Sequence, residues 1–304
     1  MSGFVHLHGH STYSLLDGAC RVPNLARQAA EQGAPALALT DHGNLFGAIE
    51  FYQQCRKAGV KPLLGFEAYV APKSRLDRER NPVAAWHLTL LAESFAGWKN
   101  LLKLSSAGYM DGFYYVPRID RELLAAHNEG VIVLSGCLSS ETSYWLRRDR
   151  QDLAEEAAGF YHETFGDRYF LEIQRHGIED QEKCLAGCVG LSRRLGRPLV
   201  ATNDFHYERR EDADAQELLV CINTGKKLAD ENRMKMSSEE LYFKPPAEMR
   251  SLFKDYPEAC DSTLAIAERC NVELPFGEMH LPQFDVPGGG DPDDYLRHLC
   301  AVSY

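Results

Sequence analysis

Residues 4–18 of the 304-residue chain read FVHLHGHSTYSLLDG, a pattern that predicts both a strand and a metal site. His6, His8 and His10 alternate, so on a strand all three side chains point to one face. A single inward histidine is usually a hydrogen-bonded core residue, and we place His6 in the core or beside the ligands. Two imidazoles close together at the end of a first strand are better explained as metal ligands, because an ion holds them in place.

Short apolar runs alternate with amphipathic stretches over the first 208 residues. Apolar strands that are each followed by a helix indicate a parallel sheet covered by helices. Seven such units favour a β/α barrel over an open doubly wound sheet, and no Gly-x-Gly-x-x-Gly motif follows the first strand. The expected strands are 4–8, 36–41, 63–70, 86–92, 131–136, 169–174 and 199–204, and the expected helices include 22–32, 46–58, 95–107 and 180–195.

The pattern changes after residue 208. Residues 211–223 and 257–270 read as helices on either side of a polar segment, and PGGGDP at 287–292 is typical of a linker. The expected division is one domain at 1–284, with a barrel core at 1–208 and a helical extension at 209–284, then a linker and the start of a further, truncated region at 285–304.

The composition is that of an ordinary globular protein. With 33 Lys and Arg against 44 Asp and Glu, the net charge is −11, which argues against a broad basic face for nucleic acid. A phosphate-bearing substrate therefore has to be attracted locally. No apolar stretch approaches the ~18 residues of a membrane span, and no signal peptide precedes the first strand, so we expect a cytoplasmic protein without membrane contact. Nine cysteines without a Cys-x-x-Cys argue against a disulfide framework and a zinc ribbon.

Metal-binding residue types recur at the ends of the expected strands, where β/α barrels carry their active sites. Each of them alone is more often a paired core residue, but chance does not place one at nearly every strand end. The nine candidate ligands are His8, His10, Asp17, His42, Glu67, His87, Cys137, Asp204 and His206.

Nine ligands are too many for one tetrahedral ion and suit two or three divalent ions. Three carboxylates and one thiolate supply four negative charges against the six positive charges of three ions, so the filled site is locally cationic. Such a cluster attracts a phosphate and lowers the pKa of bound water to roughly 7, which is the chemistry of phosphoester hydrolysis. Five histidines and a thiolate favour zinc, although manganese or iron also fits.

These motifs resemble the polymerase and histidinol phosphatase (PHP) domain family, and more narrowly the PHP domain of bacterial replicative DNA polymerase III alpha subunits. The resemblance covers essentially the whole chain. The segments that carry it are 4–18, 39–48, 64–70, 87–92, 112–120, 134–138, 201–207, 239–242 and 271–275.

The resemblance implies a distorted, seven-stranded, TIM-like β/α barrel with a trinuclear metal centre. The nine ligand positions of the family fall on the nine candidates with no departure. Asp41 lies outside that ligand set, and we interpret it as a residue that orients a neighbouring ligand. We assign catalytic roles to Asp17, His10 and Asp204, and we expect the region after 285 to begin a polymerase whose active site is absent from this chain.

Two classes of function remain open. The first is a metal-dependent 3′-5′ exonuclease that proofreads for the polymerase on the same chain. The second is a structural, metal-bound module that braces the polymerase without catalysis of its own. The implied partners are the 3′ end of DNA, the remainder of the polymerase chain and other replisome subunits. An amidohydrolase is a weaker alternative because it usually needs a bridging lysine, and no lysine lies at a strand exit here. A free-standing phosphomonoesterase is also weaker.

Basic and aromatic side chains near the strand exits are candidates for binding DNA. Arg118, Arg209 and Arg210 are the predicted phosphate contacts. Arg175 and His176 are further candidates, with an ordinary ion pair the more natural role for Arg175. The aromatic run at 113–115 either stacks a base or packs in the core.

Overall fold

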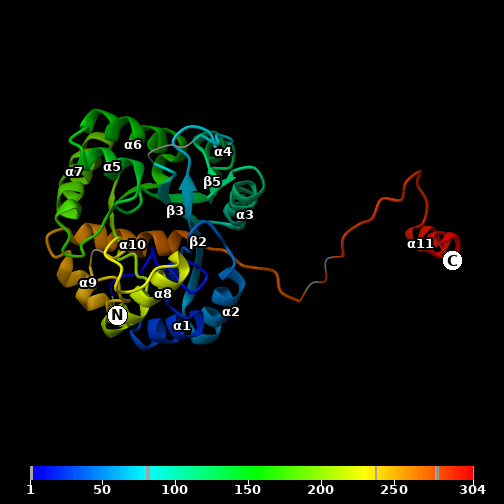
Figure 1. Cartoon of the computed structure of the whole chain (residues 1–304), viewed down its shortest axis with the longest axis horizontal. Helices are drawn as coiled ribbons and strands as arrows, with labels where there is room; N and C mark the ends of the chain where they lie inside the picture. Colours follow the sequence, from blue (N-terminus) through cyan, green and yellow to red (C-terminus); the bar gives the residue numbers. More distant parts are fainter. Residues whose placement is uncertain (1–2, 80–82, 237, 278, 280, 304) are drawn as a thin grey trace. The chain divides into compact units, whose positions relative to one another are not determined.

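The computed structural model describes residues 3–79, 83–236, 238–277, 279 and 281–303. Its centre is a mixed β-sheet with the strand order β4-β5-β2-β3-β6-β7-β8 and with β1 beside β2 (Figure 1). The strands are β1 Ala36–Leu39, β2 Lys61–Val70, β3 Trp86–Ala92, β4 Phe113–Tyr114, β5 Val116–Ile119, β6 Val131–Leu134, β7 Tyr169–Ile173 and β8 Leu199–Ala201.

The N-terminal segment joins β1 to the residues that follow β8, although it is not a regular strand as expected. The Ala38 N–H donates to the His6 carbonyl, the Thr40 N–H donates to the Gly9 carbonyl, and the His10 N–H donates to the Phe205 carbonyl. A Cβ on Gly9 would lie 2.1 Å from the Phe205 ring, so only glycine permits this approach. Six strands (β1, β2, β3, β6, β7 and β8) and this segment close a distorted seven-membered barrel, which confirms the expected fold class.

One strand of the barrel runs against its neighbours. β3 is antiparallel to both β2 and β6, so the expectation of an all-parallel sheet is wrong there. The described residues between β2 and β3 contain no helix, and antiparallel strands need none to connect them. As a result, β3 begins at the end of the barrel where β2 finishes, and His87 pairs with Tyr69.

A short hairpin, β4 and β5, extends β2 beyond the barrel. β5 pairs in parallel with the last residues of β2, at Tyr69 and Val70, on the side where β1 pairs with the first half of β2. These two strands lie outside the strands expected from the sequence. A two-residue strand next to a four-residue strand is too short to give an alternating pattern.

Helices pack around the barrel, with α1 beside α2 on one side and α5, α6 and α7 together on another (Figure 1). The expected helices are present, but α4, α5, α6 and α9 were not predicted. Asp120 and Ser140 cap the first two of these, each accepting a hydrogen bond from the backbone N–H three residues on. The helices are α1 Val22–Glu31, α2 Ala48–Ala58, α3 Phe95–Met110, α4 Arg121–Ala126, α5 Glu141–Arg147, α6 Gln151–Phe165, α7 Glu179–Leu195, α8 Ala213–Thr224, α9 Pro246–Leu252, α10 Pro257–Arg269 and α11 Pro292–Val302.

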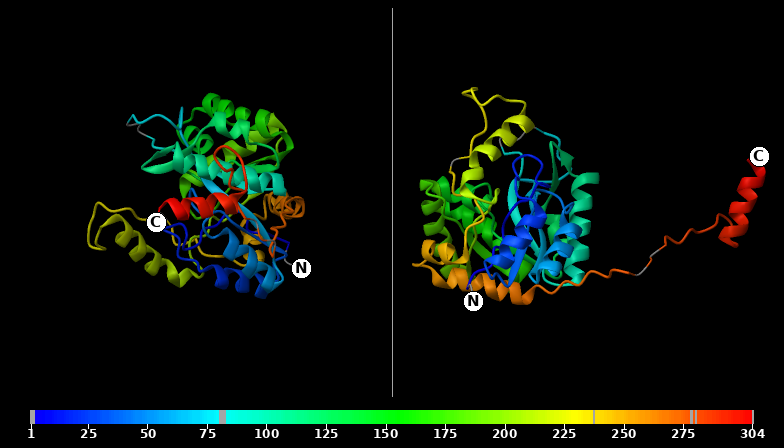
Figure 2. Two further views of the ribbon diagram at one scale, coloured as in Figure 1. Left: turned by 90° about the vertical axis from the view of Figure 1, so that its right-hand side faces the viewer. Right: turned by 90° about the horizontal axis from the view of Figure 1, so that it is seen from below.

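Helix α10 closes one end of the barrel. Its Ile266, Ala267 and Cys270 side belongs to one buried cluster with Val5 and Leu63 of the barrel interior. The right-hand view of Figure 2 shows α10, in orange, at one end of the barrel and α8 with the yellow segment after it at the other.

The chain divides into two units, Met1–Val272 and Glu273–Tyr304. The second contains α11, whose N-cap residue Asp291 accepts hydrogen bonds from the backbone N–H groups of Asp293 and Asp294. Within the part of the chain that the structure describes, each helix is too short or too polar to span a bilayer.

Candidate metal centre

The nine predicted ligands gather at the end of the barrel where the parallel strands finish. They come from the N-terminal segment, the loops after it and after β1, the strands β2 and β3, and the loops after β6 and β8. Asp17, His42, His87, Cys137, Asp204 and His206 line a cavity of about 480 Å³. His8, His10 and Glu67 are almost fully buried beneath it.

Glu67 on β2 lies at the centre of the cluster. Its Oε2 is 2.6 Å from Nδ1 of His42 and 2.9 Å from Nδ1 of His87. Its Oε1 is 3.3 Å from Nε2 of His8 and 3.6 Å from Sγ of Cys137. Glu67 therefore has four candidate ligand atoms of other residues around its carboxylate.

Asp204, just after β8, faces the two histidines of the first motif. Its Oδ1 lies 2.9 Å from Nε2 of His10 and 3.3 Å from Nε2 of His8. The Asp204 backbone is in the left-handed region, with φ 51°, which aspartate tolerates better than most residues. The ring of His206 holds this turn, because its Nδ1–H donates to the Asp204 carbonyl at 2.8 Å.

Asp17 lies on the other side of the cavity, between two further histidines. Its Oδ1 is 3.4 Å from Nε2 of His42, and its Oδ2 is 3.7 Å from Nε2 of His206. Asp17 adds a carboxylate beside three groups, in each of which the ligand atoms lie within 4.8 Å of one another and could hold an ion: His10, His42 and His206; His8, His10 and Asp204; His42, Glu67 and His87.

The cluster contains buried polar atoms that lack a hydrogen-bond partner. These include Nε2 of His8, Oδ1 of Asp17, Nδ1 of His42 and Oε2 of Glu67. Nδ1 of His42 and Oε2 of Glu67 are only 2.6 Å apart, but their arrangement does not have hydrogen-bond geometry. Buried groups of this kind are costly unless something satisfies them. Their convergence fits divalent cations, with nitrogen, carboxylate and thiol ligands of the types that zinc accepts.

The pKa shifts in the cluster also fit a site for cations. Burial alone would raise the pKa of Glu67, but His87 and His42 outweigh it and hold that pKa well below its usual range. Burial alone would lower the pKa of His8, but Asp204 and Glu172 raise it well above its ordinary value. Without a metal, therefore, ionised carboxylates are balanced by protonated imidazoles, which occupy the place of cations.

Hydrogen bonds fix the orientation of the imidazole rings. Ser14 accepts from Nδ1–H of His10 at 3.0 Å, and its own hydroxyl donates to Asp41 at 2.9 Å. Asp41 thus acts on His10 through Ser14, in line with its predicted orienting role. In His8, His10 and His206 alike, Nδ1 is bonded away from the cluster and Nε2 faces it. This arrangement selects the tautomer whose Nε2 lone pair can bind an ion.

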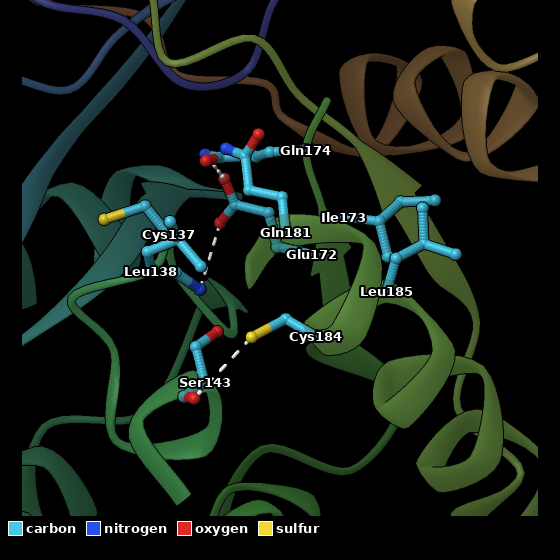
Figure 3. Close-up of a pocket in the computed structure, with 10 residues that line it drawn as sticks. Cys137, Leu138, Ser143, Glu172, Ile173, Gln174, Gln181, Cys184 and Leu185 are labelled. Carbon is cyan, nitrogen blue, oxygen red and sulfur yellow. Dashed lines mark hydrogen bonds between the residues drawn. The ribbon is translucent and has the colours of Figure 1, made fainter. Parts of the chain in front are cut away.

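Glu172 on β7 is a supporting residue that the sequence analysis missed. It is buried, it accepts from Nδ1–H of His8 at 2.7 Å and from the Gly136 N–H at 3.0 Å, and Thr202 and Gln174 also donate to it. Figure 3 shows its carboxylate between Gln174 and the turn that carries Cys137. Its only sequence signal is an acidic residue in the apolar run 169–173.

We expect Glu172→Gln to weaken metal binding by about ten- to a hundredfold, because Gln cannot fix the His8 tautomer as a carboxylate does. Titration of the metal-free protein with zinc, followed by elemental analysis, measures this effect. Glu163→Gln, which neutralises an exposed carboxylate on α6, is the matched control. Equal zinc affinities of the two variants would show that Glu172 is only a packing residue.

Cys137 follows β6 at a sharp turn. Gly136 has φ 85°, and a Cβ there would lie 2.6 Å from the His87 carbonyl, so glycine is required. Burial, together with Glu67 and Asp204, raises the pKa of the Cys137 thiol well above its ordinary value. Without a metal, the thiol therefore stays protonated at neutral pH and donates to Glu67.

Metal binding to Cys137 has to expel this proton, since the thiolate is the ligand. We expect Cys137→Ser to release about one proton fewer than the parent protein on zinc loading. A weakly buffered titration with a pH indicator detects the difference. Cys184→Ser, a buried thiol across the small cavity of Figure 3, controls for loss of a cysteine. Identical proton release by Cys137→Ser and the parent would remove Cys137 from the ligand set.

Unlike most of the candidate ligands, the predicted DNA contacts do not line the cavity, with the exception of His176. Arg118 was expected on a loop, but it lies in β5, is 4% exposed, and donates to the carbonyls of Gly112, Arg75 and Asp77. Arg118 is buried and its Nε and Nη2 donate to backbone carbonyls, which points to a structural role rather than a phosphate contact. Arg175 is bound by Asp255 and Glu182.

His176 is buried as well. Its Nε2–H donates to the Asn203 carbonyl, and its Nδ1 accepts from Gln181, both at 2.7 Å. Burial lowers its pKa to about 4, so it is neutral and holds the loop before Asp204.

The side chains of Arg209 and Arg210 are exposed, and each lies near a glutamate, Glu211 and Glu240 respectively. Contact of Arg209 and Arg210 with DNA phosphates stays a prediction. In the aromatic run, Phe113 and Tyr115 are exposed, at 51% and 79%, so neither packs in the core.

The structure therefore defines a barrel domain with a histidine and carboxylate cluster at one end that could hold metal ions. The family model for the PHP domain matches residues 6–176, and the chain belongs to this family. It is 47% identical to DNA polymerase III subunit alpha of Treponema pallidum and 45% identical to that of Thermus aquaticus, in each case over 97% of this chain. These alignments cover 26% and 25% of the two relatives, so the chain spans about a quarter of their length.

Solved structures similar to the chain are more distant. One is a two-domain protein containing a predicted PHP-like metal-dependent phosphoesterase from Bacteroides vulgatus, with 15% identity, a TM-score of 0.41, and 92% of this chain and 74% of that chain covered. Another is an amidohydrolase from Chromobacterium violaceum, with 16% identity, a TM-score of 0.37, and 66% of this chain and 87% of that chain covered.

Proposed function

We propose that the chain is the PHP domain of a DNA polymerase III alpha subunit and that it hydrolyses phosphodiester bonds as a metal-dependent 3′-5′ exonuclease. One observation carries the hydrolytic part: three overlapping groups of histidine and carboxylate atoms converge beside an open cavity of about 480 Å³. The identity to curated alpha subunits over nearly the whole chain supports the replicative part.

The side chains act in this proposal by holding ions rather than by carrying protons. His206 and His42 outweigh burial and set the pKa of Asp17 at about 2, and His8 and His10 hold that of Asp204 well below its usual range. Burial, with His42 and His206, lowers the pKa of His10 to about 3. None of the three is matched to proton transfer at neutral pH, where a catalytic acid or base needs a pKa near 7. Divalent ions would supply the missing chemistry, by neutralising phosphoryl oxygens and making a water molecule acidic.

The proposal includes two or three ions, with zinc the best match to five imidazoles and a thiolate. DNA with a free 3′ end is the proposed substrate, and the rest of a polymerase chain and other replisome subunits are the proposed partners. The cytoplasm, where bacterial replication takes place, is the proposed location. We keep the proposed domain limit near residue 284 and the start of a polymerase region at 285–304.

A structural role is the second candidate. It is favoured by the depth of His8, His10 and Glu67, each 1% exposed or less, because ions held there would join the N-terminal segment to β2 and β8. In this case the ions brace the domain against the polymerase and no bond is cleaved.

Release of nucleotides from 3′-labelled single-stranded DNA separates the two candidates. The protein is assayed with its metal content confirmed, beside a variant of one carboxylate ligand. A single strand is the better substrate, because a paired end has to fray before it can enter the cavity. Release that depends on that carboxylate supports the exonuclease, and no release by metal-loaded protein leaves only the structural role.

A further inference from the structure

A segment after α8 forms one wall of the metal cavity. Residues 225–236, here called the strap, begin at Gly225, the residue that ends α8, and return toward the strand exits. Met234, Lys235 and Met236 of the strap line the cavity together with Asp17, His42 and His206. The strap lies at the end of the barrel opposite α10, in yellow in the right-hand view of Figure 2.

The strap is anchored by hydrogen bonds of Arg233, the residue that directly precedes its cavity-lining residues. The guanidinium of Arg233 donates to Glu217 on α8 at 2.5 Å and to the Leu228 carbonyl at 3.1 Å, and its side chain is only 5% exposed. An arginine that is buried and bonded in this way fixes the position of the residue next to it.

The chain is fastened again just beyond the strap. The Ser238 hydroxyl donates to the His176 carbonyl at 2.6 Å, and the His206 N–H donates to the Leu241 carbonyl at 2.7 Å. Met234, Lys235 and Met236 are therefore held between two attachments, and the second attachment includes the backbone of a candidate ligand.

Lys235 is the only lysine or arginine among the described residues that line the cavity. Its side chain is exposed, and within the described part of the chain it forms no ion pair. This ammonium, beside a site for cations on a protein of net charge −11, is placed to attract an anion that the same site binds.

Part of the cavity wall is apolar. Leu16, Leu138, Ile178 and Met234 line it, and its volume of about 480 Å³ is that of a site for a small organic group. Methionine is flexible and polarisable, and it packs against flat rings of varied shape. A phosphate next to a nucleobase matches this combination of one cation and an apolar wall.

We propose that the strap is a nucleotide-binding wall, in which Lys235 binds the phosphate of the terminal nucleotide of a single strand and Met234 contacts its base. This inference rests on the proposed function and adds the residue that recognises the substrate. Lys235 takes the place proposed for Arg118, which is buried, does not line the cavity, and uses Nε and Nη2 for backbone carbonyls. The strand that the wall favours is unpaired, because the wall contacts a base face that stacking within a duplex would cover.

The experiment measures binding separately from cleavage. The probe is a fluorescent single-stranded oligonucleotide whose last 3′ linkage is a phosphorothioate, which resists hydrolysis, and the protein is the full chain with its metal content confirmed. We expect Lys235→Ala to weaken binding about tenfold and Lys235→Arg to restore most of it. The slope of log affinity against log salt concentration should also fall by about 0.7, the value for one phosphate contact on a single strand.

Lys227→Ala is the matched control, because it removes the same charge from the strap at a position that does not line the cavity. We expect it to bind within about twofold of the parent, with the metal content of all variants unchanged. Equal binding by Lys235→Ala and Lys227→Ala would overturn the inference. Loss of metal in Lys235→Ala, or no binding by the parent protein, would overturn it as well.

The proposed function can fail on its own in this design. If the parent protein binds the probe through Lys235 but releases nothing from ordinary DNA, the wall is confirmed and the exonuclease is not. If ordinary DNA is cleaved equally well by the parent and by Lys235→Ala, the exonuclease stands and the wall is wrong.

Discussion

Removal of the metals is expected to lower the melting temperature of the domain by about 10 °C. A single ion at a thousand times its dissociation constant contributes about 4 kcal/mol to the free energy of unfolding, and about 4 kcal/mol shifts a domain of this size by roughly 10 °C. The structural reason is the set of buried atoms without a hydrogen-bond partner on His8, Asp17, His42 and Glu67, which bound ions would satisfy. The loss should be incomplete, because protonated His8 and His42 balance part of the buried negative charge.

Differential scanning calorimetry before and after dialysis against a chelator, with metal content measured, tests this expectation. His10→Ala should reproduce part of the shift, since His10 belongs to two of the three ligand groups. His127→Ala, at the end of α4 and away from the cluster, should melt like the parent. An unchanged melting curve after verified metal removal would show that the ions are not structural.

The barrel could be predicted because its signal is local. Each buried strand reads as an apolar run, and β3 is predicted with the bounds that the structure has, Trp86–Ala92. The direction of β3 is not a local property. Nothing within an apolar run distinguishes a parallel strand from an antiparallel one; what decides is the connection, which here needs no helix. The N-terminal segment was predicted as a strand for its alternation, but it closes the barrel through only a few backbone hydrogen bonds.

The candidate ligands were predictable because histidines and carboxylates at strand ends are conspicuous in an apolar context. Glu172 was not, since a buried carboxylate in mid-strand has no spacing pattern and shows its role only through Gly136, Thr202 and His8, which are distant in sequence. Arg118 illustrates the opposite error. A basic residue near an active-site loop suggests a phosphate contact, but which carbonyls accept its hydrogen bonds depends on the β4–β5 hairpin. The cation that does line the cavity, Lys235, lies in a polar segment that carries no motif.

Asp17→Asn is expected to lower exonuclease activity by about a hundredfold or more, which is the usual effect of removing one charged group that acts directly on the reacting centre. Asn keeps the shape of Asp17 but cannot supply its negative charge, and that charge lies between His42 and His206 at the cavity wall. The fold should survive, because the loop is held by backbone bonds: the Asp17 N–H donates to the Ser14 carbonyl, and Gln216 donates to the Asp17 carbonyl.

The assay is release of nucleotides from 3′-labelled single-stranded DNA, with metal content and melting temperature recorded for each variant. Asp204→Asn should behave like Asp17→Asn, because its carboxylate contacts His8 and His10 in the same cluster. Asp214→Asn, an exposed carboxylate at the start of α8, changes the net charge by the same amount and should leave activity unchanged. Activity that survives in both ligand variants would come from a contaminating nuclease, and the metals would then brace the barrel without cleaving DNA. Activity lost in both ligand variants but kept in Asp214→Asn would place the hydrolysis at this cluster.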